Sequence, residues 1–264
     1  MKTPEKVVNH IVKWLNDYLK NSKMKGFVVG VSGGIDSAVT STLCSLTNAP
    51  VLCLEMEIHQ DPHEVSRAKQ HIDWLENKFD NVIHHNISLT GVFDQFVKGL
   101  PETAIKEEKS LSLANTRARL RMTTLYYFAT LNRYLVTGTG NKVEDFGVGF
   151  YTKHGDGGVD LSPIADLLKS QVYELARYIE VIDVIQKAAP TDGLWNDNRT
   201  DEDQMGVNYG ELEWAMRELE LNPSLKGLNQ NQLDIIKIYI NFNRQNQHKM
   251  NPIPVCEIPY SILI

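Results

Sequence analysis

Short apolar runs alternate with stretches of helical periodicity along most of the chain. Four runs rich in β-branched residues are predicted to be buried strands, and they span 27–31, 51–56, 82–87 and 134–139. Apolar residues recur at helical spacing elsewhere, over about 5–19, 37–46, 61–78, 89–133, 167–178, 209–219 and 230–246. This alternation predicts an α/β fold with a mainly parallel, doubly wound sheet flanked by helices on both faces. Ligands of such sheets bind at the carboxyl ends of the strands.

The length of 264 residues suits one large domain. We expect a single domain over 1–264, with an N-terminal helix region at 1–25 and a helical C-terminal part at 207–264. The first helix has an apolar face that must pack on the domain core or on a second subunit; its residues are Val8, Ile11, Val12, Leu15 and Leu19. The polar segment at about 190–206 is predicted to be a lid, because long polar loops in compact domains are usually functional or disordered.

Composition narrows the class of protein without naming a reaction. With 42% hydrophobic and 23% charged residues, the chain resembles an ordinary soluble enzyme. Neither a bilayer-spanning run nor a signal peptide is evident, so a cytoplasmic location is expected. We interpret Cys44, Cys53 and Cys256 as buried thiols in a reducing compartment. The net charge of −6 argues against general affinity for nucleic acid.

The stretch GVSGGIDSA, from Gly30 to Ala38, follows the first predicted strand and begins the next helix. Glycines there let backbone N–H groups approach an anion, and the helix start adds its positive dipole end. Ser32 and Ser37 offer hydroxyl donors, while Asp36 offers an oxygen ligand for magnesium. The spacing alone is equally compatible with a glycine turn in which Asp36 only caps the helix.

Three later clusters add candidate chemistry, each with a plainer alternative. NTRARLRM, 115–122, spreads three arginines around a helix, which suits an anionic substrate or a solvated basic surface. The segment GTGN, 138–141, offers hydrogen-bond donors, and Glu144 after it offers a second magnesium ligand. The plainer alternative is that this segment is only a turn. YTKHGDGGVDLSPI, 151–164, contains Asp156 and Asp160, and alone it would favour an Asp-Gly-Gly hairpin turn.

Together these segments resemble a known family. SGGIDS matches the Ser-Gly-Gly-x-Asp-Ser signature of the ATP pyrophosphatases, which cleave ATP between its α and β phosphates and adenylate a substrate. With NTRARLRM, GTGNKVED, TKHGDGGVDLSP and PTDGLW in the same order, the chain is similar to ammonia-dependent NAD synthetases from about Gly30 to Lys249. The resemblance implies a Rossmann-like fold of the adenine nucleotide α-hydrolase type.

The resemblance also implies site residues. It places magnesium at Asp36 and Glu144. It places ATP against Gly30, Val31, Ser32, Gly33, Gly34, Ile35, Asp36, Ser37, Thr139, Lys169 and Thr191. It places deamido-NAD against Arg119, Lys153, Asp160, His248 and Lys249.

The implied reaction is ATP-dependent amidation of deamido-NAD to NAD with ammonia, through a nicotinate adenylate. We predict that Asp156 selects ammonium and takes its proton. The chain has no room for the glutaminase domain of glutamine-dependent relatives, so ammonia is the expected donor, and family members are homodimers. Three alternatives stay open: the amidating domain of GMP synthetase, a tRNA thiolase and a nucleotide sensor. The sequence shows neither the catalytic cysteines nor the basic surface expected of a thiolase.

Overall fold

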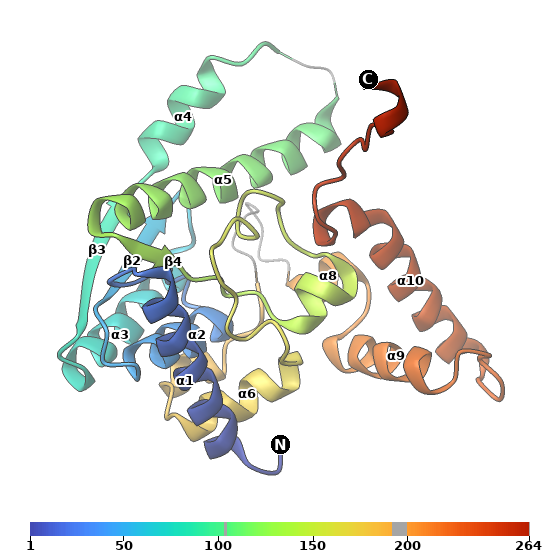
Figure 1. Ribbon diagram of the computed structural model, residues 1–264, viewed down its shortest axis with the longest axis horizontal. Coiled ribbons are helices and arrows are strands. Elements are labelled where there is room, and N and C mark those ends of the chain that lie inside the picture. Colours follow the sequence, from blue (N-terminus) through green and yellow to red (C-terminus); the bar gives the residue numbers. More distant parts are fainter. Residues whose placement is uncertain (103–104, 192–199, 264) are drawn as a thin grey trace.

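A computed structural model describes residues 1–102, 105–191 and 200–263, and it contains a parallel sheet between two helical layers (Figure 1). The strand order is β3-β2-β1-β4, and every neighbouring pair is parallel. The strands are β1 (Gly26–Gly30), β2 (Val51–Glu57), β3 (Val82–Ser88) and β4 (Tyr134–Val136). The predicted α/β fold is therefore confirmed, although β4 is shorter than expected.

The chain reverses its winding at β1. It first moves outward to β2 and β3, and it then returns to place β4 on the other side of β1. A crevice opens where the strand order reverses, and ligands of parallel sheets bind there. The glycine loop, which directly follows β1, lies at this switch point.

Successive residues of β1 face opposite helical layers. Phe27 and Val29 belong to one apolar cluster, whereas Val28 belongs to the other. The first layer contains α1 (Pro4–Ser22), α2 (Ile35–Ser45), α3 (Pro62–Lys78) and α6 (Lys169–Tyr178), and the second contains α4 (Thr90–Lys98) and α5 (Lys106–Asn132). The apolar face of α1 packs into the first cluster, so it contacts the core of its own chain.

The region predicted to be helical over 89–133 is helical, with one break. Two helices, α4 and α5, occupy it. Gly99 is the C-terminal cap of α4, and Pro101 follows two residues later. Proline lacks a backbone N–H and clashes with a preceding helical turn, so the helix ends here.

A helical group beside the sheet layers forms a third apolar cluster (Figure 1). Its elements are the π-helix η1 (Val143–Val148), α8 (Asp201–Met205), α9 (Tyr209–Leu221) and α10 (Gln230–Met250). The short α7 (Asp183–Gln186) and the 3-10 turn η2 (Tyr260–Ile262) complete the elements of the described ranges. The segment expected to be irregular over 190–206 ends in α8, and its residues 192–199 lie outside the described part.

Two of the three cysteines have the predicted environment. Cys44 and Cys53 are buried free thiols, and burial raises the pKa of Cys44 to about 12. The expectation for Cys256 is wrong, because this thiol lies exposed in the C-terminal tail. Of the helices that the structure describes, none is both long and apolar enough to span a bilayer.

The helix behind the glycine loop is buried although it is rich in hydroxyl side chains. Thr40, Ser41 and Thr42 of α2 are almost fully inaccessible. The Ser41 hydroxyl lies 2.9 Å from Nε2 of His71, a buried side chain of α3 whose ring stacks on Trp74. Burial lowers the pKa of His71 to about 4, so the ring stays neutral at physiological pH. A polar contact between α2 and α3 thus holds the helix that follows the loop.

Candidate active site

The glycine loop is held by hydrogen bonds between its own serines. The hydroxyls of Ser32 and Ser37 lie 3.1 Å apart, and the Ser32 N–H donates to Ser37 Oγ at 3.2 Å. Gly34 is the N-terminal cap of α2, so Asp36 lies in the first helical turn. The alternative interpretation of Asp36 as the cap is therefore wrong, and its carboxylate is available to other partners.

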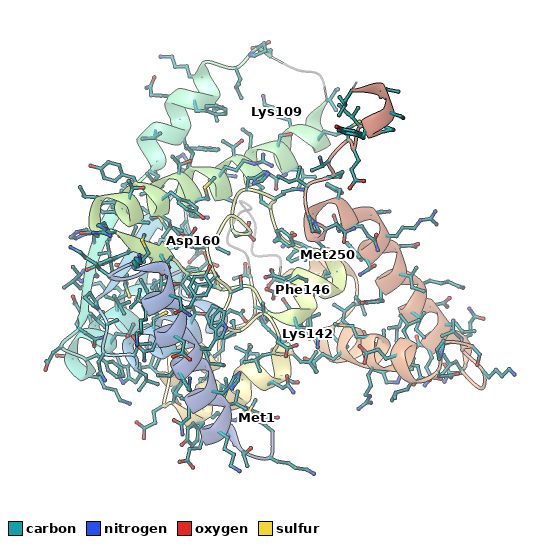
Figure 2. The ribbon with its side chains drawn as sticks, viewed as in Figure 1. Met1, Lys109, Lys142, Phe146, Asp160 and Met250 are labelled. Atoms are coloured by element: carbon teal, nitrogen blue, oxygen red, sulfur yellow. The ribbon has the colours of Figure 1, made fainter. Side chains whose placement is uncertain are left out.

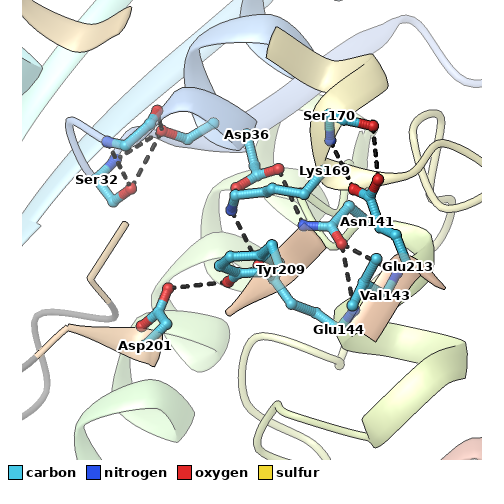
Figure 3. Close-up of polar contacts among 12 residues, drawn as sticks. Ser32, Asp36, Asn141, Val143, Glu144, Lys169, Ser170, Asp201, Tyr209 and Glu213 are labelled. Atoms are coloured by element: carbon cyan, nitrogen blue, oxygen red, sulfur yellow. Dashed lines mark hydrogen bonds and ion pairs between the residues drawn. The ribbon is translucent and has the colours of Figure 1, made fainter. Parts of the chain in front are cut away.

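Lys169 binds two carboxylates from distant parts of the chain (Figure 3). Its Nζ lies 2.5 Å from Asp36 Oδ2 and 3.0 Å from Glu144 Oε1. Asp36 comes from the start of α2, Glu144 from η1 and Lys169 from the first position of α6. The backbone N–H and the hydroxyl of Ser170 both donate to Glu213 of α9, which anchors the start of α6.

Burial makes the charges of this cluster interact strongly. The Lys169 side chain is only 4% exposed. Burial alone would lower its pKa, but Asp36 and Glu144 outweigh that effect and raise the Lys169 pKa, so it remains an ammonium. For Asp36, burial raises the pKa, Lys169 opposes this rise and Glu144 adds to it. The cluster combines one cation with two carboxylates and favours a further positive charge.

Two polar side chains fix the orientation of the carboxylates. Buried Asn141 donates from Nδ2 to Asp36 Oδ1 at 3.2 Å, and its Oδ1 accepts from the N–H groups of Val143 and Glu144. The Tyr209 hydroxyl lies 2.6 Å from Glu144 Oε1 (Figure 3). Burial, followed by the charges of Glu144 and Asp201, raises the Tyr209 pKa, so the phenol keeps its proton and acts as a donor.

A cavity of about 240 Å³ opens beside this cluster. One part of its wall is polar and contains Asp36, Glu144 and Lys169. Another part is mainly apolar and contains Leu54, Met56, Met122 and Leu125. Its mixture of apolar wall and converging polar groups is typical of a small-molecule site.

The cavity wall also contains Asp145, a carboxyl group with a raised pKa. Burial, and next the negative charge of Glu144, raise the pKa of Asp145 to about 8. The Asp145 carboxyl group lies against Gly140 and occupies the place that a Cβ atom would take there. A larger residue at position 140 would therefore displace this carboxyl group from its present position.

The donor set fits a magnesium ion. Magnesium prefers oxygen ligands and is usually held by one or two carboxylates together with substrate phosphates. Asp36 and Glu144 supply two carboxylates that converge on one point and border the cavity. No group of three or more His, Cys, Asp or Glu side chains suitable for a metal occurs within residues 1–102, 105–191 and 200–263.

The sequence matches a family model described as NAD synthase over residues 7–253. This chain belongs to the NAD synthase family. The resemblance inferred from the motifs is thereby confirmed.

Individual members of this family, and solved structures, are similar to nearly the whole chain. An NH(3)-dependent NAD(+) synthetase from Carboxydothermus hydrogenoformans is 36% identical, over 93% of this chain and 94% of its own length. The structure of an NMN synthetase from Francisella tularensis has a TM-score of 0.80 at 32% identity, covering 97% of this chain and 98% of that one. An NH3-dependent NAD synthetase from Campylobacter jejuni has a TM-score of 0.76 at 27% identity, covering 96% and 99%.

Most residues expected to bind ATP and magnesium border the same cavity. They are Gly30, Val31, Ser32, Gly34, Ile35, Asp36, Ser37, Thr139, Glu144, Lys169 and Thr191. Asp156, the expected base, also lies in the wall. Gly33 does not border the cavity, and an added Cβ atom there would point at α3, toward the backbone of Glu64 and Ala68.

The residues expected to bind deamido-NAD lie outside the cavity wall. Arg119 donates to the carbonyl of Lys153, whose Nζ binds the carbonyl of His248. Lys249 donates to the carbonyls of Gly149 and Tyr151, both at 2.9 Å. Four of the five residues thus gather where the 149–153 segment meets the end of α10.

Asp160, the fifth residue, lies apart from this group. Its carboxylate accepts from the Val136 N–H at 2.8 Å and from the Tyr126 hydroxyl at 3.1 Å. Figure 2 shows it on the sheet side of the molecule, whereas Met250, at the end of α10, lies on the other side. The structure therefore does not bring Asp160 together with the other four.

Several side chains of the site escaped the sequence analysis. Asn141 belongs to a quoted motif, but its role depends on contacts with Asp36. Arg121 binds the carbonyl of Met56 and the side chain of Gln60 in the cavity wall. Tyr209 lies 65 residues from Glu144 in sequence, and no local pattern marks it. Only the tertiary contacts reveal these roles.

From the geometry of the glycine loop, we predict that replacing Gly33 and Gly34 by alanine affects the stability of the protein differently. Gly33 has a φ of +84°, and a Cβ there would lie 2.7 Å from the carbonyl oxygen of Glu64. Gly33→Ala is therefore expected to lower the free energy of unfolding by at least about 1–3 kcal/mol, the usual cost of such a backbone strain. Thermal unfolding of the purified variants measures the effect.

Gly34→Ala is the matched control. Its φ of −93° suits any residue, and the nearest atom, Ser32 Oγ, would lie 3.4 Å from the new Cβ. We expect an unfolding temperature close to that of the unmodified chain. Equal losses for the two variants would contradict the assigned loop geometry.

Proposed function

We propose that this chain catalyses the ATP-dependent amidation of deamido-NAD to NAD with ammonia, releasing AMP and pyrophosphate. The observation that carries the proposal is the buried Lys169 cluster beside the glycine loop, in the wall of one cavity. An anion-binding loop, a fixed ammonium and two carboxylates suit a nucleotide whose pyrophosphate must depart. ATP is then a co-substrate of the reaction.

The reaction needs ATP because a carboxylate has no adequate leaving group for ammonia. A nicotinate oxygen attacks the α phosphorus, the bond from this phosphorus to the bridging oxygen of the β phosphate breaks, and pyrophosphate leaves with the electron pair. Ammonia then attacks the activated carbonyl carbon, AMP leaves, and the nitrogen loses a proton. Lys169 and the N–H groups of the loop stabilise the charge that develops on pyrophosphate.

Asp36 and Glu144 would hold magnesium in this reaction. When bound, the ion supplies positive charge to the phosphate oxygens. Lys169 keeps both carboxylates in place before nucleotide arrives, and Asn141 fixes the Asp36 carboxylate.

Deamido-NAD is proposed to contact Arg119, Lys153, His248 and Lys249, with Asp160 as a separate contact. Arg119, Lys153 and Lys249 concentrate positive charge at the end of α10, close to Tyr151 and Gly149. A dinucleotide has two phosphates, so a cationic group outside the ATP cavity suits its binding.

The structural similarity to an NMN synthetase supports a second candidate substrate, nicotinate mononucleotide. The same amidation would convert it to NMN. We expect the purified protein to form NAD from deamido-NAD with ATP, magnesium and ammonium, at a higher kcat/KM than NMN from the mononucleotide. Chromatography of products and AMP measures both reactions.

A preference for the mononucleotide would replace the first candidate with the second. Formation of neither product, together with turnover of xanthosine monophosphate or modification of tRNA, would assign the chain to another ATP pyrophosphatase. ATP binding without any turnover would favour a nucleotide sensor.

Asp156 is proposed to receive the proton of ammonium. Its Oδ1 accepts from the Thr152 N–H at 2.9 Å, and the residue borders the cavity. In Asp156→Asn the amide oxygen still accepts this bond, so the turn should persist while basicity is lost. We expect ammonia-dependent NAD formation to fall by about 100-fold or more, the usual scale for acid-base catalysis.

ATP–pyrophosphate exchange dependent on deamido-NAD is the matched readout for the first step, and we expect it to persist in this variant. Unchanged NAD formation would exclude Asp156 from proton transfer. Loss of exchange to the same extent as amidation would show that the substitution acts before ammonia attack.

A homodimer is proposed because apolar side chains are exposed on one layer and on the tail. They include Val92, Phe96, Leu100, Leu111, Tyr127, Leu131, Ile253, Val255 and Ile262. Where exposed apolar side chains form a patch, they usually mark a protein contact. A cytoplasmic location and the absence of nucleic-acid partners stay predictions; the buried free thiols and the net charge of −6 support them.

Tyr127 and Leu131 test the dimer because they are 64% and 65% exposed and lie one turn apart on α5. Replacing both by Glu is expected to produce a monomer in sedimentation velocity, since buried unpaired charge opposes association. The control is Gln70→Glu, because Gln70 is an exposed residue of α3 on the opposite layer. This variant should leave the assembly unchanged. A monomeric wild-type protein would contradict the proposal.

A further inference from the structure

Tyr209 is a buried tyrosine in the first turn of α9, and its hydroxyl group enters the Lys169 cluster. The side chain is 6% exposed. Asn208 caps the helix by accepting from the Glu211 N–H at 2.9 Å, and the Tyr209 N–H donates to Glu202 at 3.0 Å. The position of the ring is therefore fixed by the start of α9 and by α8.

The hydroxyl group acts on one oxygen of Glu144. Both Tyr209 OH and Lys169 Nζ bind Oε1, at 2.6 and 3.0 Å. Lys169 Nζ also lies 4.7 Å from the centre of the Tyr209 ring, a distance typical of a cation–π contact. Both of these contacts leave Oε2 free of a hydrogen bond from the described side chains of the cluster, Lys169 and Tyr209.

The same hydroxyl reaches a second part of the cavity wall. It lies 3.2 Å from Asp201 Oδ2, and the Asp201 N–H donates to the carbonyl of Pro190 at 3.1 Å. Pro190, Thr191 and Asp201 all border the cavity. Tyr209 thus connects the carboxylate pair to Asp201 in the cavity wall (Figure 3).

We propose that Tyr209 is a positioning residue that holds Oε1 of Glu144 and so presents Oε2 to the divalent cation that enters with ATP. The inference rests on the proposed function, because it assumes that Glu144 holds magnesium. A carboxylate with one oxygen fixed by a phenol and an ammonium has lost most of its rotational freedom. Residues that orient a metal ligand in this way commonly change metal affinity by 10–100-fold when they are replaced.

Tyr209→Phe tests the proposal because it removes the hydroxyl and keeps the ring over Lys169. Titration calorimetry with α,β-methylene-ATP, which resists cleavage between these phosphates, measures nucleotide binding at a series of magnesium concentrations. We expect the magnesium concentration for half-maximal binding to rise about tenfold. Affinity for the nucleotide without magnesium should change less than threefold.

Tyr239→Phe is the matched control. Tyr239 packs in the same apolar cluster from α10 and has no polar contact with the site residues. Removing its hydroxyl makes the same chemical change, so it should leave the magnesium midpoint unchanged. Thermal unfolding of both variants shows whether either loses its fold.

A folded Tyr209→Phe protein with the magnesium midpoint of the wild type would overturn the proposal. Equal shifts in both variants would overturn it as well, because they would show a general effect on the cluster. Magnesium-independent nucleotide binding by the wild type would exclude the assumed metal role and the proposal with it. Failure to form NAD would contradict the proposed reaction alone, since the binding measurement needs no amidation.

Discussion

The ammonium group of Lys169 holds the site together. It joins Asp36, 133 residues earlier in the sequence, to Glu144, which is 25 residues earlier. All three side chains are largely buried, so each charge has lost most of its hydration. Removing one partner from such a group leaves an uncompensated buried charge, which typically costs about 3–5 kcal/mol. The elements that carry these residues must therefore keep their relative positions.

Those positions follow from the winding of the sheet. β1 ends at the glycine loop, and β4 ends at the segment that leads into η1 and Glu144. Because β1 and β4 are parallel neighbours on the side opposite β2, their carboxyl ends open into the same crevice. The start of α6 then brings Lys169 between the two carboxylates. The ion pairs and the sheet topology therefore both place Asp36, Glu144 and Lys169 together.

The cluster of Asp36, Glu144 and Lys169 carries a net negative charge, which distinguishes it from the cationic residues near the end of α10. Two carboxylates and one ammonium suit a magnesium ion and the phosphates that accompany it. The cationic residues near the end of α10 form a second group, held by backbone carbonyls and separate from the cavity wall. Under the proposed function, ATP and deamido-NAD would bind to neighbouring surfaces. Tyr151 links the two, because it borders the cavity and its carbonyl accepts a hydrogen bond from Lys249.

The sequence by itself determined the parallel α/β fold, the place of the glycine loop between a strand and a helix, and the family. These features depend on local patterns: apolar runs, glycines at a strand end and motifs whose order is visible along the chain. It also indicated eleven of the cavity residues expected for ATP and magnesium. Only the tertiary structure decided that Gly33 faces α3, that Asp160 binds the Val136 N–H, and that Tyr209 binds Glu144. The reason is physical, because a hydrogen bond or an ion pair between distant residues depends on how helices pack, and that packing leaves no periodic signal in either segment.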